Sequence, residues 1–184
     1  KIHGIWQARD DQRQLVIVRP GVVFGPGEGG NVSRLIKAVH KRYFFYMGNR
    51  ETRKAGIYVK ELCIAMMWVL NSKKAAIDGV TLFNMSMNPG PSIEEYVNSI
   101  AKIGKISVWI PYVPSLFLFI IAYLIEIIAK PLGIQHPFSP VRIKKLIRSN
   151  NILPTYLIEN GYKYKYTLDS AFADWKKNCP EEWR

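Results

Sequence analysis

The stretch LVIVRPGVVFGP at residues 15–26 decides how the fold of this 184-residue chain is interpreted. Its first half is a run of apolar, mostly β-branched residues that ends in Arg19-Pro20-Gly21. The run is too short for a helix and is bounded by Pro and Gly, so it predicts a fully buried strand over residues 15–19, central in a parallel sheet. Ligands of open α/β sheets bind where such a strand opens into a loop, which here is Pro20, Gly21 and Val22.

Strands and helices alternate along the rest of the chain, which indicates an α/β fold. Ser92 and Glu95 have the spacing of a capping box before a helix. Cys63 falls in an apolar helical pattern and is expected in the core. We expect extended segments at 43–47, 57–59 and 80–85. Helices are expected at 1–12, from Asn31 or Ser33 to about 42, and at 60–70, 93–103, 141–148, 154–160 and from Thr167 or Asp169 to about 177.

The formal net charge of +12 predicts anionic partners. Lys and Arg are spread along the chain and no nucleic-acid-binding module is recognisable, so we expect no nucleic-acid partner. A nucleoside diphosphate or a membrane surface would use the same charge, and an ordinary solvated basic surface is the alternative. Cys63 and Cys179 are too few for a disulfide framework, which favours a reducing, cytoplasmic compartment. The three histidines have no metal-ligand spacing, and no metal is predicted.

Residues 106–128 form an apolar run in which Glu126 is the single charged residue. Pro111 and Pro114 should break it and leave one helix over residues 115–128. That helix would be roughly 21 Å long, against about 30 Å for the hydrocarbon core of a bilayer, so we expect that it does not span a membrane. It would either be buried against the protein or a partner, or lie in a membrane interface.

Several segments, taken in order, resemble one family. Arg19, Val23, Phe24, Gly25 and Pro26 fit the pattern Arg-x-x-Asn-Val-Tyr-Gly-Pro of extended short-chain dehydrogenases/reductases, the NAD-dependent epimerase/dehydratase family. The segment RKAGIYVKEL resembles the family's Arg-Asp-Tyr-x-His-Val-x-Asp. The segments VTLFNMSMNPGPSIEEY and NILPTYLIENGYKYKYTLDSAFADW resemble the strand, turn and final helix of its substrate lobe. The resemblance covers nearly the whole chain.

The resemblance implies the C-terminal half of a Rossmann-like fold with a mainly helical substrate lobe. Residues 1–184 would be a single partial domain, truncated before Lys1, without the dinucleotide-binding half. The sequence has no Gly-rich fingerprint after a first strand and no Tyr-x-x-x-Lys pair; the family carries both upstream. We therefore assign no catalytic residue in this chain. The parent enzyme would bind NAD or NADP, with Pro20, Gly21 and Val22 at the nicotinamide end, and the chain alone should be inactive.

The resemblance also places substrate contacts at Asn31 and Lys54, and Leu35 and Arg142 are further candidates. Arg142 and Arg148 lie in the basic helical stretch VRIKKLIR near the expected substrate cleft, where one of them would bind phosphate; a solvated face is the simpler alternative. Asn31 and Lys54 would face a diphosphate, although a helix cap and a solvated cation are the simpler alternatives. Val22 stands where sugar epimerases usually have Asn, and it cannot make that hydrogen bond. Three functions stay open. The first is an epimerase or dehydratase acting on a nucleotide-sugar. The others are a hydroxysteroid-dehydrogenase-like reductase and a non-catalytic, membrane-associated binding protein. Peripheral membrane contact through residues 115–128 and a homodimer are the further partners considered.

Overall fold

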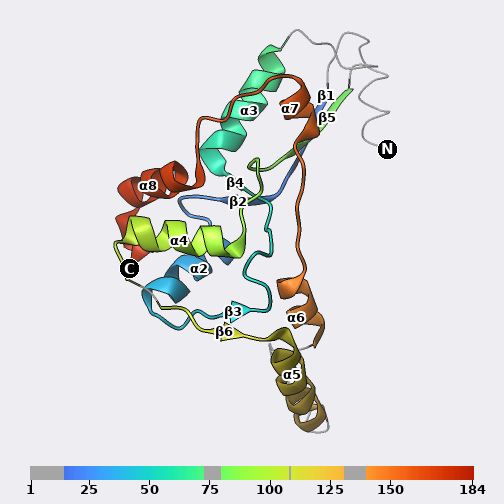
Figure 1. Ribbon diagram of the computed structural model, residues 1–184. Helices are drawn as coiled ribbons and strands as arrows, with labels where there is room; N and C mark the ends of the chain where they lie inside the picture. Colours follow the sequence, from blue (N-terminus) through green and yellow to red (C-terminus); the bar gives the residue numbers. More distant parts are fainter. Residues whose placement is uncertain (1–14, 73–79, 108, 131–139) are drawn as a thin grey trace.

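The computed structural model describes residues 15–72, 80–107, 109–130 and 140–184, so the helix expected at 1–12 lies outside the described residues. Helices and strands alternate as the sequence predicts (Figure 1). The strands are β1 (Leu15–Pro20), β2 (Val22–Phe24), β3 (Tyr46–Met47), β4 (Gly56–Tyr58), β5 (Val80–Met85) and β6 (Tyr112–Val113). The α-helices are α2 (Asn31–His40), α3 (Val59–Asn71), α4 (Ile93–Gly104), α5 (Ser115–Ala129), α6 (Pro140–Ile147), α7 (Thr155–Glu159) and α8 (Leu168–Asn178), and the 3-10 helix η2 (Pro180–Trp183) follows.

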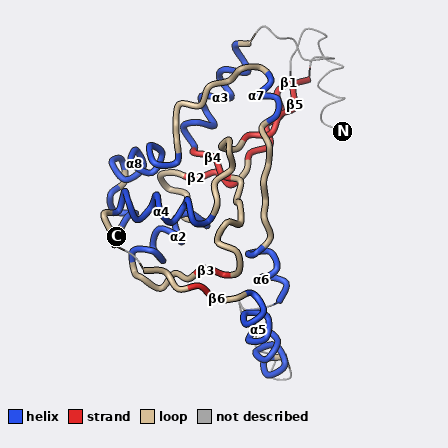
Figure 2. Tube along the Cα trace, in the orientation of Figure 1, coloured by secondary structure: helices blue, strands red, loops and turns tan. Residues whose placement is uncertain are grey.

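The strands pair in parallel, β1 with β5, β2 with β4, and β3 with β6. Figure 2 shows the β1–β5 pair at one end of the molecule and the β3–β6 pair near the other. Gly21 lies where the chain changes partner. Its amide donates to the Met85 carbonyl at 2.8 Å, and the next amide, of Val22, donates to the Ala55 carbonyl at 2.9 Å. A Cβ at position 21 would lie 2.6 Å from that Ala55 oxygen, so this close approach requires glycine.

The main core surrounds Phe24, which is fully buried at the end of β2. Its ring contacts those of Tyr58, Tyr96, Phe172 and Trp175, with centroid distances from 5.5 to 6.4 Å. These rings come from β4, α4 and α8, so one aromatic cluster joins the sheet to the helices beside it. Large buried aromatic side chains dominate the energy of such a core.

Glu61, on α3, is a buried carboxylate that connects α3 to the C-terminal segment. It accepts hydrogen bonds from the Tyr162 hydroxyl and from the amides of Lys165, at 3.0 Å, and Tyr166, at 2.7 Å. Burial and the hydrogen bond to Glu61 raise the pKa of Tyr162 well above its ordinary value. A buried carboxylate is tolerated because donors surround it.

Most predicted elements are confirmed. The strand at 80–85 is β5, the capping box of Ser92 and Glu95 begins α4, and Thr167 caps α8 through a capping box with Ser170. Pro114 precedes α5, which therefore starts at Ser115 as expected.

Two expectations about burial are wrong. The strand predicted as fully buried and central, β1, has β5 as its neighbour in a two-stranded sheet of the described chain. Its Ile17 is exposed, as is Leu82 on β5, because no described layer covers that side. The helix α3 is buried along one stripe, at Glu61, Ala65 and Val69, and its Cys63 is exposed instead of lying in the core. The apolar sequences of β1 and α3 do not indicate which of their sides other elements cover.

A second, smaller group of buried residues lies at the other end of the molecule. The α5–α6 cluster consists of Leu118 and Ala122 on α5 and Ile143 on α6, with Phe45, Met47, Val113, Phe119 and Ile147 packed against it. Within the described residues, no helix is both long and apolar enough to cross a bilayer.

Candidate functional site

The predicted cofactor turn, Pro20 to Val22, lies at the carboxyl ends of β1 and β5, where Pro20 is paired with Met85. In an open α/β sheet this edge is where ligands bind. Val22 and Pro20 are exposed, whereas the backbone of Gly21 is held between Met85 and Ala55. The chain that follows β5 also lies beside this turn, because the Met87 amide donates to the carbonyl of Gly56, the residue paired with Val22, at 2.8 Å.

Lys54 lies directly beside this turn, because the next residue, Ala55, accepts the amide of Val22. Its own backbone is held from two sides: the amide donates to Pro91 at 2.9 Å, and Lys54 forms a parallel bridge with Asn150. The Lys54 ammonium donates to the Arg148 carbonyl at 2.7 Å. Burial lowers the pKa of Lys54. The backbone of Lys54 therefore lies next to the turn, whereas its partly desolvated ammonium is held at the end of α6; its role in binding stays a prediction.

Arg53, the residue before Lys54, helps to hold this segment in place. Its guanidinium donates to the Gly90 carbonyl, and its backbone oxygen accepts the Asn150 amide at 2.8 Å. The segment that carries Lys54 is thus fixed between the loop after β5 and the chain after α6. Both adjacent cations donate to backbone carbonyls, Arg53 to that of Gly90 and Lys54 to that of Arg148.

Asn31 does not cap α2, because α2 begins at Asn31 itself, after Gly30, with no side-chain cap at that position. Instead the carboxylate of Glu28 accepts hydrogen bonds from the amide of Ser33, at 2.8 Å, the Ser33 hydroxyl, at 2.6 Å, and the Val32 amide, at 3.4 Å. Burial opposes ionisation of Glu28, but these hydrogen bonds outweigh it and lower its pKa. The amides that would favour a substrate anion beside Asn31 are already occupied by a carboxylate.

Glu28 was not among the predicted site residues, although the glycine spacing of its loop marks a helix N-terminus that can bind an anion. Gly25, Gly27 and Gly30 have the G-x-G-x-x-G spacing between a strand and a helix. In dinucleotide-binding folds such a loop leaves the helix N-terminus open for a pyrophosphate. Here Glu28, inside the loop, occupies that N-terminus, and the Gly27 amide donates to Glu182 at 2.9 Å. The glycine-containing loop is therefore bound to Glu182 near the C-terminus of the chain, and Glu28 takes the position that a pyrophosphate would occupy.

The remaining predicted residues are not all gathered at the turn. Leu35 is half-buried and packs against the main core. Arg142 lies on α6, whose C-terminal end approaches Lys54 through Arg148. The roles of Asn31, Leu35 and Arg142 in substrate binding stay predictions.

A separate cavity of about 660 Å³ lies between α4, the loop after β5 and the segment before α8. Its wall includes the Lys102–Asp169 ion pair, at 2.5 Å, and Ser99, whose hydroxyl donates to Asp169 at 2.5 Å. The hydrogen bond from Lys102 and that from Ser99 lower the pKa of Asp169. These contacts join α4 to α8, and none of the predicted site residues lines the cavity.

Known proteins share the fold described above. This is the α/β fold of the extended short-chain dehydrogenases/reductases, and the expected resemblance to NAD-dependent epimerases is confirmed. No family model matches the chain. Among curated proteins it is similar to N-acetyl-alpha-D-glucosaminyl-diphospho-ditrans,octacis-undecaprenol 4-epimerase of Escherichia coli O157:H7. The two are 25% identical over 160 residues, which cover 87% of this chain and 47% of that protein.

Solved structures show the same fold. The human epimerase family protein SDR39U1 with NADPH has a TM-score of 0.64 at 18% identity, over 96% of this chain and 54% of that one. The UDP-N-acetylglucosamine 4-epimerase of Bacillus cereus has a TM-score of 0.61 at 11% identity, over 97% and 50%. The chain thus spans about half the length of the proteins it matches.

Proposed function

We propose that this chain is the substrate-side part of an NAD(P)-dependent epimerase that acts on a sugar diphosphate. The observation that carries the proposal is the position of Lys54 beside the Pro20–Val22 turn, at the carboxyl ends of β1 and β5. The Lys54 ammonium is partly desolvated and lies at the Arg148 carbonyl. From there it would meet the diphosphate of a substrate bound at this edge as a point charge.

The described residues fit one edge of a dinucleotide site. The amides of Gly21 and Val22 are both used within the chain, so the turn offers a bound cofactor the Val22 side chain and a close backbone surface. When bound, NAD(P) would accept and return a hydride at a sugar carbon. The chain's own part is to position the sugar diphosphate against the nicotinamide. The acid/base pair would come from the half that this sequence does not contain.

Two substrate types share the chemistry that Lys54 recognises. One is the nucleotide-sugar predicted from the sequence, and the other is the polyprenyl-linked sugar diphosphate in the name of the E. coli relative. Both present a hexose on a diphosphate, and they differ in what lies beyond it. Val22 removes the hydrogen bond that Asn would make to the sugar, so specificity would depend on the groups around the diphosphate.

Calorimetry of the chain with UDP-N-acetylglucosamine and with a short-chain polyprenyl-diphosphate N-acetylglucosamine tests this proposal. We expect binding of a diphosphate sugar and loss of about tenfold or more in affinity for Lys54→Ala, because a charge-assisted hydrogen bond is removed. Lys37→Ala, which removes an exposed lysine of α2, is the matched control. We expect no tight binding of NAD(P) alone. Absence of binding to either sugar diphosphate, or equal effects of the two variants, would contradict the proposal.

The exposed, apolar Val22 favours one second candidate, a hydroxysteroid-dehydrogenase-like reductase with an apolar substrate. A steroid ligand would contact Val22 and would not depend on Lys54. Binding of a hydroxysteroid that is unchanged in Lys54→Ala, with no binding of either sugar diphosphate, would favour this reading. The cytoplasmic location expected from the cysteines stays a prediction.

A further inference from the structure

The helix α5 carries a continuous apolar face that the protein does not cover. At 100° per residue, its exposed side chains fall within an arc of about 160°. This apolar face of α5 comprises Leu116, Phe117, Ile120, Ile121, Tyr123, Leu124, Ile127 and Ile128. The buried residues Leu118, Ala122 and Ala129 lie on the opposite side and face α6.

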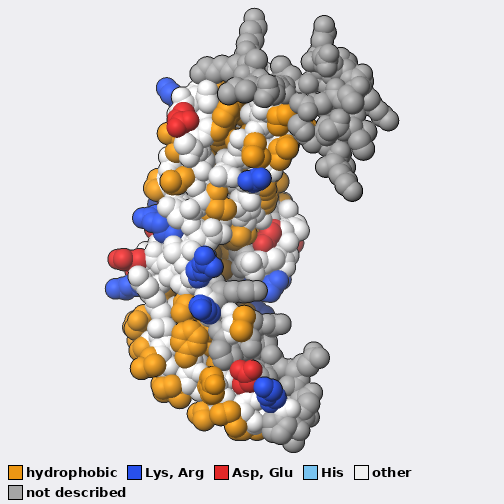
Figure 3. Space-filling model, turned by 90° about the vertical axis from the view of Figure 1, so that its right-hand side faces the viewer, with side chains coloured by type: hydrophobic (Ala, Val, Ile, Leu, Met, Phe, Trp, Pro, Cys, Tyr) orange, Lys and Arg blue, Asp and Glu red, His pale blue; other side chains and the backbone are white. Residues whose placement is uncertain are grey.

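No charge interrupts this face. Glu126 is the single charged residue of α5, and by helical geometry it lies outside the arc, next to the buried side. In Figure 3, hydrophobic side chains gather at the lower end of the molecule, where Figure 1 places β6 and α5. A helix that is apolar on one exposed side and shorter than a bilayer core suits the plane of a membrane interface.

Exposed aromatic side chains lie in the segment before α5. Trp109 is 87% exposed and Tyr112 is 57% exposed, and they lie six and three residues before the first residue of α5. Tyr123 lies on the apolar face itself. Trp and Tyr are enriched at the level of lipid headgroups because one end of each ring system is apolar and the other polar.

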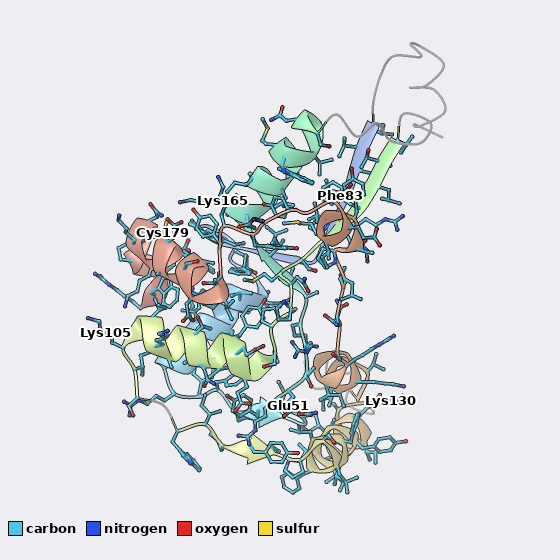
Figure 4. All side chains as sticks on the ribbon, turned by 45° about the horizontal axis from the view of Figure 1, so that its top comes forward. Glu51, Phe83, Lys105, Lys130, Lys165 and Cys179 are labelled. Carbon is cyan, nitrogen blue, oxygen red and sulfur yellow. The ribbon has the colours of Figure 1, made fainter. Side chains whose placement is uncertain are left out.

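The surrounding charge favours anionic lipid over a second copy of the chain. Lys130, labelled in Figure 4, follows α5 directly, is exposed, and by helical geometry lies beside Tyr123 at the edge of the apolar face. Lys144 and Arg148 are exposed on or directly after α6, which packs against the opposite side of α5. Anionic headgroups attract such cations. A second copy would bring the same positive charges and the same net charge of +12 to the contact. Like charges at a self-interface oppose association.

We propose that the apolar face of α5, with Trp109 and Tyr112, docks onto an anionic lipid surface with the helix lying in the interface. The face inserts between headgroups, and Lys130 at the end of the helix contacts the anionic headgroups. The apolar face of α5 contains none of the residues proposed to bind the sugar diphosphate, and its test needs no substrate.

Flotation with vesicles of phosphatidylcholine and phosphatidylglycerol tests the docking surface. The variants Phe117→Glu and Leu124→Glu place a charge in the middle of the apolar face. Met67→Glu is the matched control, because Met67 lies on helix α3 and is 56% exposed, the same fraction as Leu124. We expect the wild type and Met67→Glu to float, and each α5 variant to lose about tenfold or more in partitioning. Thermal unfolding of each variant checks that the fold is kept.

A second measurement does not depend on α5 being altered. The wild type should bind vesicles of pure phosphatidylcholine more weakly than anionic ones, and raised salt should reduce the difference. Brominated lipid should quench tryptophan emission in the wild type and less in Trp109→Phe. A wild-type chain that fails to float would overturn the proposal, as would α5 variants that float like Met67→Glu. A dimer that Leu124→Glu dissociates, without vesicle binding, would instead assign the face to a second copy.

Discussion

The main core and the helix α5 are both rich in apolar residues, yet they end in opposite environments. Phe24, Phe172 and Trp175 are fully inaccessible to solvent, because rings from β2, β4, α4 and α8 enclose one another. In α5, which is more apolar in composition than α8, only Leu118, Ala122 and Ala129 are buried. The difference lies in the neighbours available: α6 is the helix packed against α5, whereas several elements meet around Phe24.

Apolar side chains therefore have two different roles in this protein. In the main core it stabilises the fold, because its burial removes hydrocarbon from water. On the exposed face of α5 it contributes little to folding and is available for a contact outside the chain. Substitutions in the two regions should therefore differ greatly in their effect on the free energy of unfolding.

The largest effect is expected from Trp175→Ala. Removing this fully buried indole leaves a cavity among Phe24, Phe172 and Trp183 and should lower the free energy of unfolding by about 3–5 kcal/mol. Phe117→Ala, on the apolar face of α5, should change it by less than about 0.5 kcal/mol. Urea denaturation followed by circular dichroism measures both, and similar losses in the two variants would remove the distinction between the regions.

Glu61→Ala should cost about 2–3 kcal/mol, because the Tyr162 hydroxyl and the amides of Lys165 and Tyr166 lose their acceptor inside the protein. Glu61→Gln keeps an acceptor oxygen and should cost less. Glu51→Ala, which removes an exposed carboxylate, is the control. If Glu61→Ala unfolded at the same urea concentration as Glu51→Ala, the buried carboxylate would not connect α3 to the C-terminal segment as described.

Leu118→Ala tests the α5–α6 cluster. It removes the largest side chain that α5 buries and should reduce local stability by about 2 kcal/mol. Because the cluster is small, we expect faster amide exchange in α5 and α6 with little change in α4. Hydrogen exchange with mass spectrometry measures this, and equal acceleration in α4 would show that α5 unfolds together with the main core.

Glu28→Gln should have the smallest effect, about 1 kcal/mol, because it weakens the capping of α2. The pKa of Glu28 is lowered by folding, so its stabilisation is fully present above the ordinary carboxyl pKa. It is lost as the pH falls through the lowered folded value. The difference between wild type and Glu28→Gln should therefore be present at neutral pH and shrink in acid. A difference that does not change with pH would contradict an ionised cap.

Much of the fold was predictable because its signals are local. Residues 80–85 form β5 as expected, Ser92 and Glu95 cap α4, and Pro114 positions the start of α5. Of the candidate site, the structure joins the turn at Pro20–Val22 to the segment that carries Lys54, through Val22 and Ala55. The binding roles of these residues stay predictions. Glu28 was missed because its role depends on how the loop bends to bring its carboxylate to Ser33, five residues further along the chain.

The amino-acid sequence by itself determined the order of strands and helices, the apolar character of α5 and the resemblance to NAD-dependent epimerases. These depend on propensity, capping and spacing along the chain. Only the tertiary structure decided that β1 gives way to β2 at Gly21, that Cys63 faces solvent, and that one side of α5 stays uncovered. Burial depends on which distant segments pack against a residue, and the apolar character of a side chain does not specify whether such a segment will cover it.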